Sequence, residues 1–132
     1  MISEFSTSWN ASVQPRKQRK YRANAPLHIK HRFLSAHLSK ELRTKYGKRN
    51  LPLRIGDEVL VMRGSFRKKK TKVISIHLKR GKVALEGIQR TRRDGTKVNV
   101  FFRAHALKIT ALSLDDKERL TAVQRQSAKK AT

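Results

Sequence analysis

Residues 53–81 constrain the fold of this chain more than any other stretch, because they hold two short apolar runs joined by a basic loop. The first run, 59–62, follows a Gly-Asp turn, and the second covers 73–76. Between the two runs, residues 67–72 are all basic except Thr71. Short apolar runs bounded by turn residues are typical of β-strands. The stretch therefore predicts two strands and a cationic loop that can bind phosphate groups.

Three further strands are expected after this unit. The pair Asp94-Gly95, between the predicted strands at 82–88 and 97–102, is a strong signal for a hairpin turn. Five short strands in residues 53–110 predict a mainly β fold, namely a small closed or nearly closed antiparallel barrel. A core of this size is marginal by itself, so docking of the preceding segment is expected to support it. The predicted strands cover residues 58–63, 72–78, 82–88, 97–102 and 106–110.

Residues 16–52 are expected to form a basic, helical extension in front of the barrel. Within it, residues 26–47 repeat apolar side chains at helical spacing, and Gly47 is typical of the position just past a helix end. Ser35 and Ser39 could divide this region into two shorter helices, with Ser39 capping the second. The apolar stripe consists of Leu27, Leu34, Leu38, Leu42 and Tyr46.

The two ends of the chain are expected to be less regular. Residues 1–15 are rich in serine and lack periodicity, which predicts an irregular arm whose Trp9 could pack on a partner. Residues 111–132 are expected to hold a short C-terminal helix and a tail. The segment 113–116 resembles a capping box with acids in the first helical turn, and the helix is predicted to run to about Val123.

The net charge of the chain indicates the kind of partner. The sequence holds 33 Lys and Arg residues against 9 Asp and Glu residues, which gives a formal net charge of +24. Like charges at this density repel one another in a compact chain, and a bound polyanion relieves that repulsion. Nucleic acid is therefore the expected partner, ahead of an anionic membrane surface. No apolar run approaches the length that a membrane span needs.

No arrangement of catalytic or metal-binding residues stands out, so we expect neither an enzyme nor a cofactor, a metal or a small-molecule substrate. The chain has no cysteine, which excludes disulfides, a thiol nucleophile and zinc fingers with Cys ligands. It also has no phosphate loop ending in Gly-Lys-Ser/Thr and no nucleophile elbow. His28, His31 and His37 could share a helix face, but their cationic surroundings favour contact with RNA phosphate or sugar.

Residues 53–81 resemble the KOW motif, the Gly-Asp, apolar and Gly signature of an SH3-like barrel in ribosomal and transcription-elongation proteins. The segment before them is more specific. Residues 24–64 are similar to the universal large-subunit ribosomal protein twenty-four family in its archaeal/eukaryotic form, and the resemblance covers about residues 16–120. The most telling blocks are Asn24-Ala25-Pro26-Leu27-His28, Leu38-Ser39-Lys40-Glu41-Leu42-Arg43 and Lys45-Tyr46-Gly47.

The resemblance implies a structural protein of the large ribosomal subunit. Members of the family bind the 5′ region of the large-subunit rRNA early in assembly and sit near the exit of the peptide tunnel. The implied partners are this rRNA, neighbouring ribosomal proteins and tunnel-exit factors, and the implied location is the cytoplasmic ribosome. A hairpin at about residues 88–98 would lie near the tunnel opening.

The chain departs from the family pattern at two places. Lys68 and Thr71 stand where the family has glycines in the first loop. If the position of Thr71 required a positive φ, the threonine would be strained, so this loop is expected to follow its own path. Ahead of the last strand, residues 103–105 replace the family's His-Pro-Ser.

The expected RNA-binding residues belong to the extension, the first loop and the 88–98 hairpin. Cations that only confer solubility are normally mixed with acids, which is not the case here. Tyr21, inside the basic run 16–24, could also stack on a base. The expected set is Arg16, Lys17, Arg19, Lys20, Arg22, His28, Lys30, His31, Arg32, Lys40, Arg43, Lys45, Lys48, Arg49, Arg63, Ser65, Phe66, Arg67, Lys68, Lys69, Lys70, Lys72, Arg90, Arg92 and Arg93.

Two other functions fit a KOW-type barrel. A transcription-elongation factor would carry an α/β domain before the barrel, and the lead of about fifty residues is too short for one. An SH3-like protein-interaction module would need an aromatic-lined groove, whereas Phe66, Phe101 and Phe102 are the only aromatic residues in the predicted barrel.

Overall fold

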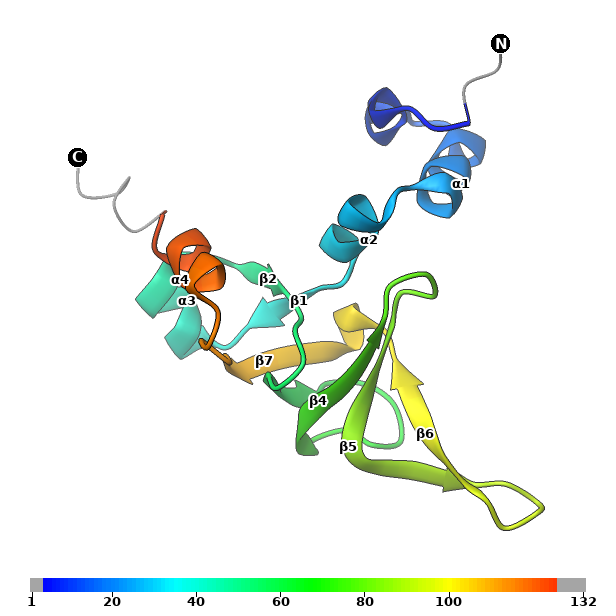
Figure 1. Cartoon of the computed structure of the whole chain (residues 1–132), viewed down its shortest axis with the longest axis vertical. Helices are drawn as coiled ribbons and strands as arrows, with labels where there is room; N and C mark the ends of the chain where they lie inside the picture. The colour runs from blue at the N-terminus through cyan, green and yellow to red at the C-terminus, as the bar shows by residue number, and fades with distance from the viewer. Residues whose placement is uncertain (1–3, 126–132) are drawn as a thin grey trace.

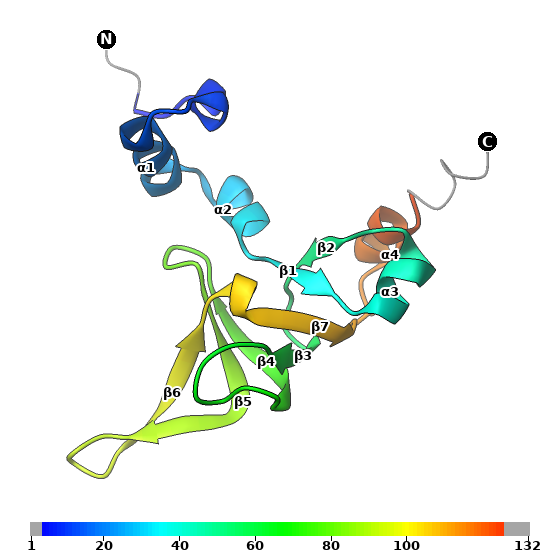
Figure 2. The same cartoon turned by 180° about the vertical axis from the view of Figure 1, so that it is seen from behind.

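The structure, a computed structural model that describes residues 4–125, is organised around one strongly bent sheet of seven strands (Figures 1 and 2). The strand order is β2-β1-β7-β3-β4-β5-β6, in which β1 and β7 are parallel and the other neighbours are antiparallel. The prediction of a mainly β fold is confirmed. The strands are β1 (Ser35–Leu38), β2 (Asn50–Pro52), β3 (Glu58–Val61), β4 (Lys70–His77), β5 (Lys82–Thr91), β6 (Lys97–Phe102) and β7 (Leu107–Ala111).

The sheet bends because β4 and β5 are irregular. The register shifts between Val73 and Ser75 in one pair and between Ala84 and Gln89 in the next. Gly87 lies inside the second shift with a φ of +67°, a conformation that glycine adopts without a steric penalty. The bent sheet encloses the main core, which includes the buried side chains of Val59, Val61, Val73, Val83, Leu85, Ile88, Leu107 and Ile109.

The predicted helical region at residues 26–47 is not one element. It contains α2 (Leu27–Phe33), the strand β1 and α3 (Lys40–Tyr46). The division into two helices is confirmed, since the hydroxyl of Ser39 accepts a hydrogen bond from the backbone N–H of Leu42 at 3.3 Å. Gly47 ends α3, as expected, and adopts the left-handed conformation. The strand between the two helices was not predicted.

β1 forms because its side chains alternate. Leu34, Ala36 and Leu38 are buried in the main core, whereas Ser35 and His37 point away from it. A spacing of four residues fits a helix and a strand equally well, so Leu34 and Leu38 misled the helical interpretation. β1 pairs with β7, so the sheet begins inside the extension rather than at residue 53.

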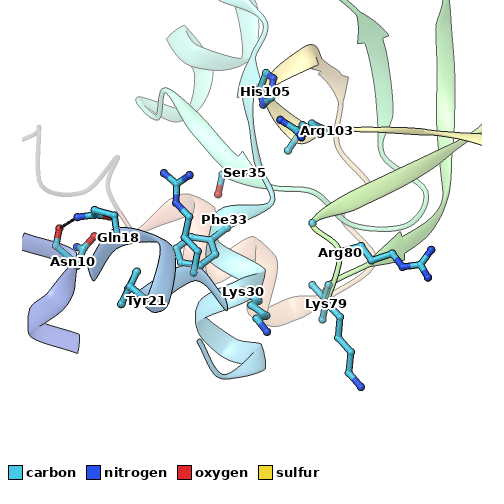
Figure 3. A pocket seen from close by; sticks show the side chains of 14 residues that line it. Asn10, Gln18, Tyr21, Lys30, Phe33, Ser35, Lys79, Arg80, Arg103 and His105 are labelled. Atoms are coloured by element: carbon cyan, nitrogen blue, oxygen red, sulfur yellow. Dashed lines mark hydrogen bonds between the residues drawn. The ribbon is translucent and has the colours of Figure 1, made fainter. Parts of the chain in front are cut away.

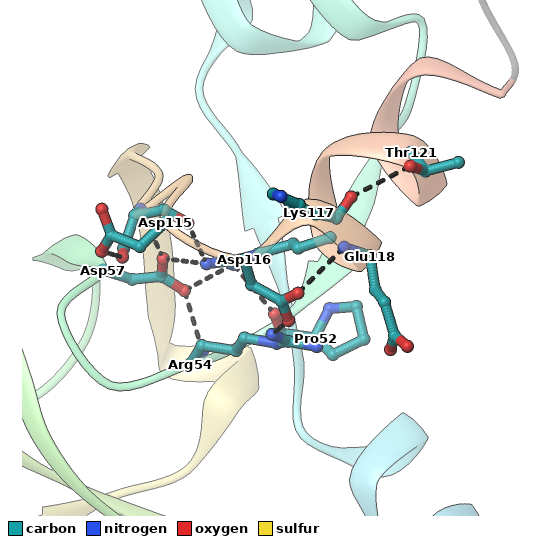
Figure 4. A network of polar contacts seen from close by, with 10 residues as sticks. Pro52, Arg54, Asp57, Asp115, Asp116, Lys117, Glu118 and Thr121 are labelled. Atoms are coloured by element: carbon teal, nitrogen blue, oxygen red, sulfur yellow. Dashed lines mark hydrogen bonds and ion pairs between the residues drawn. The ribbon is translucent and has the colours of Figure 1, made fainter.

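The C-terminal helix α4 (Lys117–Gln124) is joined to the sheet by a buried ion pair (Figure 4). Asp57 is 0% exposed and Arg119 is 6% exposed. The Arg119 Nη1 and Nη2 groups donate to the Asp57 Oδ1 and Oδ2 atoms at 2.6 and 2.7 Å. The same carboxylate accepts hydrogen bonds from the backbone N–H groups of Arg54 and Ser113, at 2.8 and 3.1 Å. Both oxygens of the buried acid are therefore satisfied.

The start of α4 differs from the prediction. The helix begins at Lys117, and Asp116 rather than a residue at 113 is its N-cap, accepting a hydrogen bond from the backbone N–H of Glu118 at 2.9 Å. The same side chain forms an ion pair with Arg54. The carboxylate at the cap is favoured by the positive end of the helix dipole. Most of the predicted C-terminal tail lies outside the described residues.

An N-terminal arm, residues 4–33, projects from the sheet (Figures 1 and 2). It consists of η1 (Thr7–Ala11), α1 (Pro15–Asn24) and α2. The sequence predicted an irregular segment at residues 1–15, whereas residues 7–11 form a 3-10 helix. Tyr21 is only 8% exposed: its ring stacks on Phe5 with centroids 5.4 Å apart and forms a T-shaped contact with Phe33 at a centroid distance of 5.7 Å. Base stacking by Tyr21 is therefore a wrong prediction, because both rings already cover it.

Candidate nucleic-acid interface

The expected RNA-binding residues lie in four separate regions rather than in one site. These regions are the arm, the segment of α3 and residues 48–49 beside α4, the β3–β4 loop (residues 62–69) with the start of β4, and the β5–β6 hairpin (Figure 1). The arm and the hairpin tip lie at opposite ends of the longest axis of the molecule (Figure 1). The arrangement suits a partner that runs along the whole protein.

All of the expected residues reach solvent. None of them is buried. Those side chains that make no contact inside the protein are therefore available to a partner. The partly buried members are Lys20, Lys30, His31, Arg43, Lys48 and Phe66.

Several expected residues, among them Arg43, Lys48 and Phe66, make structural contacts that the sequence did not signal. The Arg43 Nε group donates to the carbonyl of Leu38 at 3.0 Å, and the Lys48 ammonium donates to the carbonyl of Ala122. Phe66 packs on the main core, with its ring edge-on to Phe102 at 6.1 Å. These side chains hold the fold together in addition to any contact with a partner.

The β3–β4 loop is held by its own backbone. The N–H of Lys68 donates to the carbonyl of Val61 at 2.9 Å, and the N–H of Arg67 donates to the carbonyl of Gly64 at 3.1 Å. Lys68 has a φ of 71° and is the one residue other than glycine with a positive φ between residues 4 and 125. Thr71 lies in β4 opposite Val59. The loop does need a glycine-like conformation, but at Lys68 and not at Thr71.

Replacing Lys68 by glycine is expected to raise the free energy of unfolding by about 1 kcal/mol, because glycine adopts a positive φ without the clash of a Cβ atom. The measurement is urea unfolding of the two proteins. Lys69→Gly is the control: it removes the same charge where φ is not positive, so it should not stabilise. Equal effects of both changes would contradict the strain at Lys68.

The tip of the β5–β6 hairpin is organised by one carboxylate. Asp94 Oδ1 accepts hydrogen bonds from the backbone N–H and the hydroxyl of Thr96, at 3.0 and 2.7 Å. The hydrogen bond from the Thr96 hydroxyl is the main cause of a lowered pKa at Asp94, and the backbone N–H of Thr96 adds to it. The turn presents the exposed side chains of Arg90, Arg92 and Arg93 to solvent.

We expect Asp94 to titrate below the ordinary aspartate pKa of 3.8, because both hydrogen bonds favour the ionised form. The turn contacts are thus present above that range and are lost as the pH falls through the lowered pKa. An NMR titration of the side chain measures this. Thr96→Val should raise the pKa toward 3.8, whereas Thr91→Val should leave it unchanged. An unaltered pKa in Thr96→Val would show that the hydroxyl is not responsible.

A cleft of about 540 Å³ lies between the arm and the sheet (Figure 3). One side is formed by the arm, and the other by the β4–β5 turn and by η2 (Ala104–Ala106). Four basic residues in its lining are missing from the expected set, because they were interpreted as turn residues or as a departure from the family pattern. They are Lys79, Arg80, Arg103 and His105.

Comparison with known sequences gives the chain a family. The sequence profile that matches residues 12–126 is described as that of the ribosomal proteins called L26 in eukaryotes, together with their archaeal counterparts. The chain belongs to this family. The match includes α1 and α2 of the arm, the sheet and α4, so the resemblance seen in the sequence is confirmed over nearly all of the described chain.

Three archaeal relatives of this chain are each named "Large ribosomal subunit protein uL24". The protein of Korarchaeum cryptofilum is 44% identical over 118 residues, which cover 89% of this chain and 90% of that protein. The protein of Sulfolobus acidocaldarius is 42% identical, with coverages of 87% and 86%. The protein of Methanothrix thermoacetophila is 47% identical, with coverages of 82% and 93%.

The described part of the chain shows neither a metal-binding cluster nor a membrane-spanning helix. Between residues 4 and 125, no group of three or more His, Cys, Asp or Glu side chains is arranged to hold a metal ion. No helix in this part of the chain is long and apolar enough to cross a membrane.

Proposed function

We propose that this protein is a structural component of the large ribosomal subunit that binds large-subunit rRNA. The observation that carries the proposal is the family match, which spans residues 12–126 and includes the basic lead as well as the barrel. The three relatives bear the name of a large-subunit protein. The match over the lead favours this function over a transcription-elongation factor. The core positions of Phe66 and Phe102 argue against a peptide-binding SH3-like groove.

The mode of binding follows from the placement of the cations. Exposed Lys and Arg side chains on the arm, the β3–β4 loop and the hairpin tip can each neutralise phosphates along a folded RNA. If about ten phosphates are neutralised, the logarithm of the affinity falls with the logarithm of the salt concentration at a slope of roughly −7 to −9. Because these three regions are held by one sheet, their spacing selects RNA by shape more than by base sequence.

We further propose where on the ribosome the protein acts and at what stage of assembly. The protein binds the 5′ region of the rRNA, acts early in assembly of the subunit and contacts neighbouring ribosomal proteins. The β5–β6 hairpin lies near the exit of the peptide tunnel, where factors that act on the nascent chain could also contact it. Its location is the cytoplasmic ribosome. The support for these points is the family membership together with the exposed, cationic tip at Arg92 and Arg93.

Sucrose-gradient sedimentation of cell extract tests the proposal. We expect the protein to migrate with large subunits and to stay with them in high salt, since many simultaneous contacts dissociate slowly. Migration in the light fractions at both salt concentrations would overturn the ribosomal function. Cross-linking of the comigrating protein to rRNA fragments then tests the 5′ region, and a cross-link confined to another region would contradict that part alone.

A further inference from the structure

The cleft between the arm and the sheet has a strongly cationic lining. Arg22 and Lys30 come from the arm, Lys79 and Arg80 from the β4–β5 turn, and Arg103 from the segment before η2. Among the described residues, no carboxylate lines the cleft. Cations gathered from three separate segments around one hollow repel one another unless an anion lies between them. The lining therefore fits an anionic occupant. Figure 3 shows the two sides facing each other.

The cleft also contains an aromatic ring that is open to solvent. Phe33, at the end of α2, is 43% exposed and lines the cleft. Its ring forms a T-shaped contact with the ring of Tyr21, with centroids 5.7 Å apart and an interplanar angle of 67°, so the buried tyrosine holds Phe33 in place. An exposed, fixed aromatic ring among cations is the combination with which proteins bind unpaired nucleic acid, since the ring stacks on a base and the cations bind phosphates.

The size of the cleft agrees with such an occupant. About 540 Å³ is in the range of sites that hold a molecule of nucleotide size, and it is too small for an RNA double helix. Lys30 already donates a hydrogen bond to the carbonyl of Ala23 at 3.1 Å, so one wall of the cleft is fixed before a ligand binds. An acidic peptide would satisfy the cations but would leave the ring of Phe33 without a stacking partner.

We propose that this cleft binds an unpaired segment of RNA, with one base stacked on Phe33 and the flanking phosphates on Arg22, Arg80 and Arg103. The site deepens the proposed function and rests on it, because the RNA would be a single-stranded segment of the rRNA. The rest of the proposed interface contacts the RNA backbone. The cleft adds one contact that depends on an unpaired base.

Binding of two fluorescent RNA probes to the full chain tests this site. One probe is an unpaired 12-nucleotide strand of alternating adenine and cytosine, and the other is the same strand paired with its complement. Phe33→Leu should weaken binding of the unpaired strand by about tenfold without changing its salt slope, because stacking of a base is lost and no charge is. The duplex should bind this variant as it binds the wild type. The double variant Arg80→Gln, Arg103→Gln removes two phosphate contacts. For the unpaired strand, its plot of log affinity against log salt concentration should be less steep by about 1.4, or about 0.7 for each contact.

Two further variants serve as controls for Phe33→Leu. Phe33→Tyr retains a ring and should bind the unpaired strand as the wild type does, which separates stacking from damage to the arm. Phe101→Leu removes another exposed ring, 38% exposed on β6 and outside the cleft, and should have no effect.

Wild-type affinity of Phe33→Leu for the unpaired strand would overturn the inference, as would an equal loss in Phe101→Leu. Efficient displacement of the unpaired strand by a polyglutamate peptide of the same charge would also overturn it and would indicate an acidic protein partner. Sedimentation distinguishes the two proposals: a protein that migrates with large subunits but shows no dependence on Phe33 retains its proposed function and loses this site. A dependence on Phe33 without comigration would support the cleft and overturn the ribosomal function.

Discussion

Replacing Asp57 by alanine is expected to lower the free energy of unfolding by about 3–5 kcal/mol, because the change leaves the buried guanidinium of Arg119 without its counter-charge. It also removes the acceptor for the backbone N–H groups of Arg54 and Ser113. For a domain of this size the midpoint of thermal unfolding should fall by about 10 °C or more. Thermal and urea unfolding followed by circular dichroism measure both quantities.

The controls separate the ion pair from a general effect of removing acid. Asp115→Ala removes an exposed carboxylate four residues before Arg119, and it should change the stability by less than about 1 kcal/mol. Asp57→Leu combined with Arg119→Met should recover part of the loss, because no unpaired charge remains in the core. If Asp57→Ala were no more harmful than Asp115→Ala, the buried pair would not hold α4 on the sheet.

Neutralising the β3–β4 loop is expected to weaken binding of large-subunit rRNA by about 100-fold at about 0.1 M salt, and to make the salt slope less steep by about 2–3. The variant combines Lys68→Asn and Lys69→Gln in the loop with Lys70→Gln at the first residue of β4. Asparagine tolerates the positive φ of Lys68, so the loop should keep its path. Filter binding over a salt series measures the affinity and the slope.

The matched control for this variant changes Lys108, Lys117 and Arg125 to glutamine. It reduces the net charge by the same amount, but its three positions lie on β7 and around α4, outside the expected interface. Its salt slope should stay close to that of the wild type. Equal slopes in the two triple variants would show that the loop contributes only through the total charge of the protein.

The sequence predicted the strands of the barrel well, because each is short, apolar and bounded by turn residues. The predicted strand at 97–102 agrees with β6, and the strand predicted at 106–110 differs from β7 by one residue at each end. β1 was missed because Leu34 and Leu38 are four residues apart, a spacing that two secondary structures share. Whether such a segment becomes a strand depends on the free edge of β7, which the local sequence does not contain.

The candidate interface was predictable where cations are consecutive, as at residues 67–70, because a run of like charge is visible in the sequence. The cleft was not predictable. Its cations come from segments about eighty residues apart, such as Arg22 and Arg103, and only the fold brings them together. The role of Asp57 was hidden for the same reason, since its partner Arg119 is 62 residues away.

The position of β7 in the sheet has a consequence for folding during synthesis. β7 is the last strand of the sheet in chain order, yet it lies between β1 and β3. A nascent chain that has not yet extended past residue 106 therefore has two unpaired strand edges where β7 will insert, and such edges are prone to aggregation. Completion of the sheet requires contacts between distant parts of the chain, which form slowly. Because β7 is an inner strand of the sheet, the sheet cannot be completed until about four fifths of the polypeptide have been synthesised.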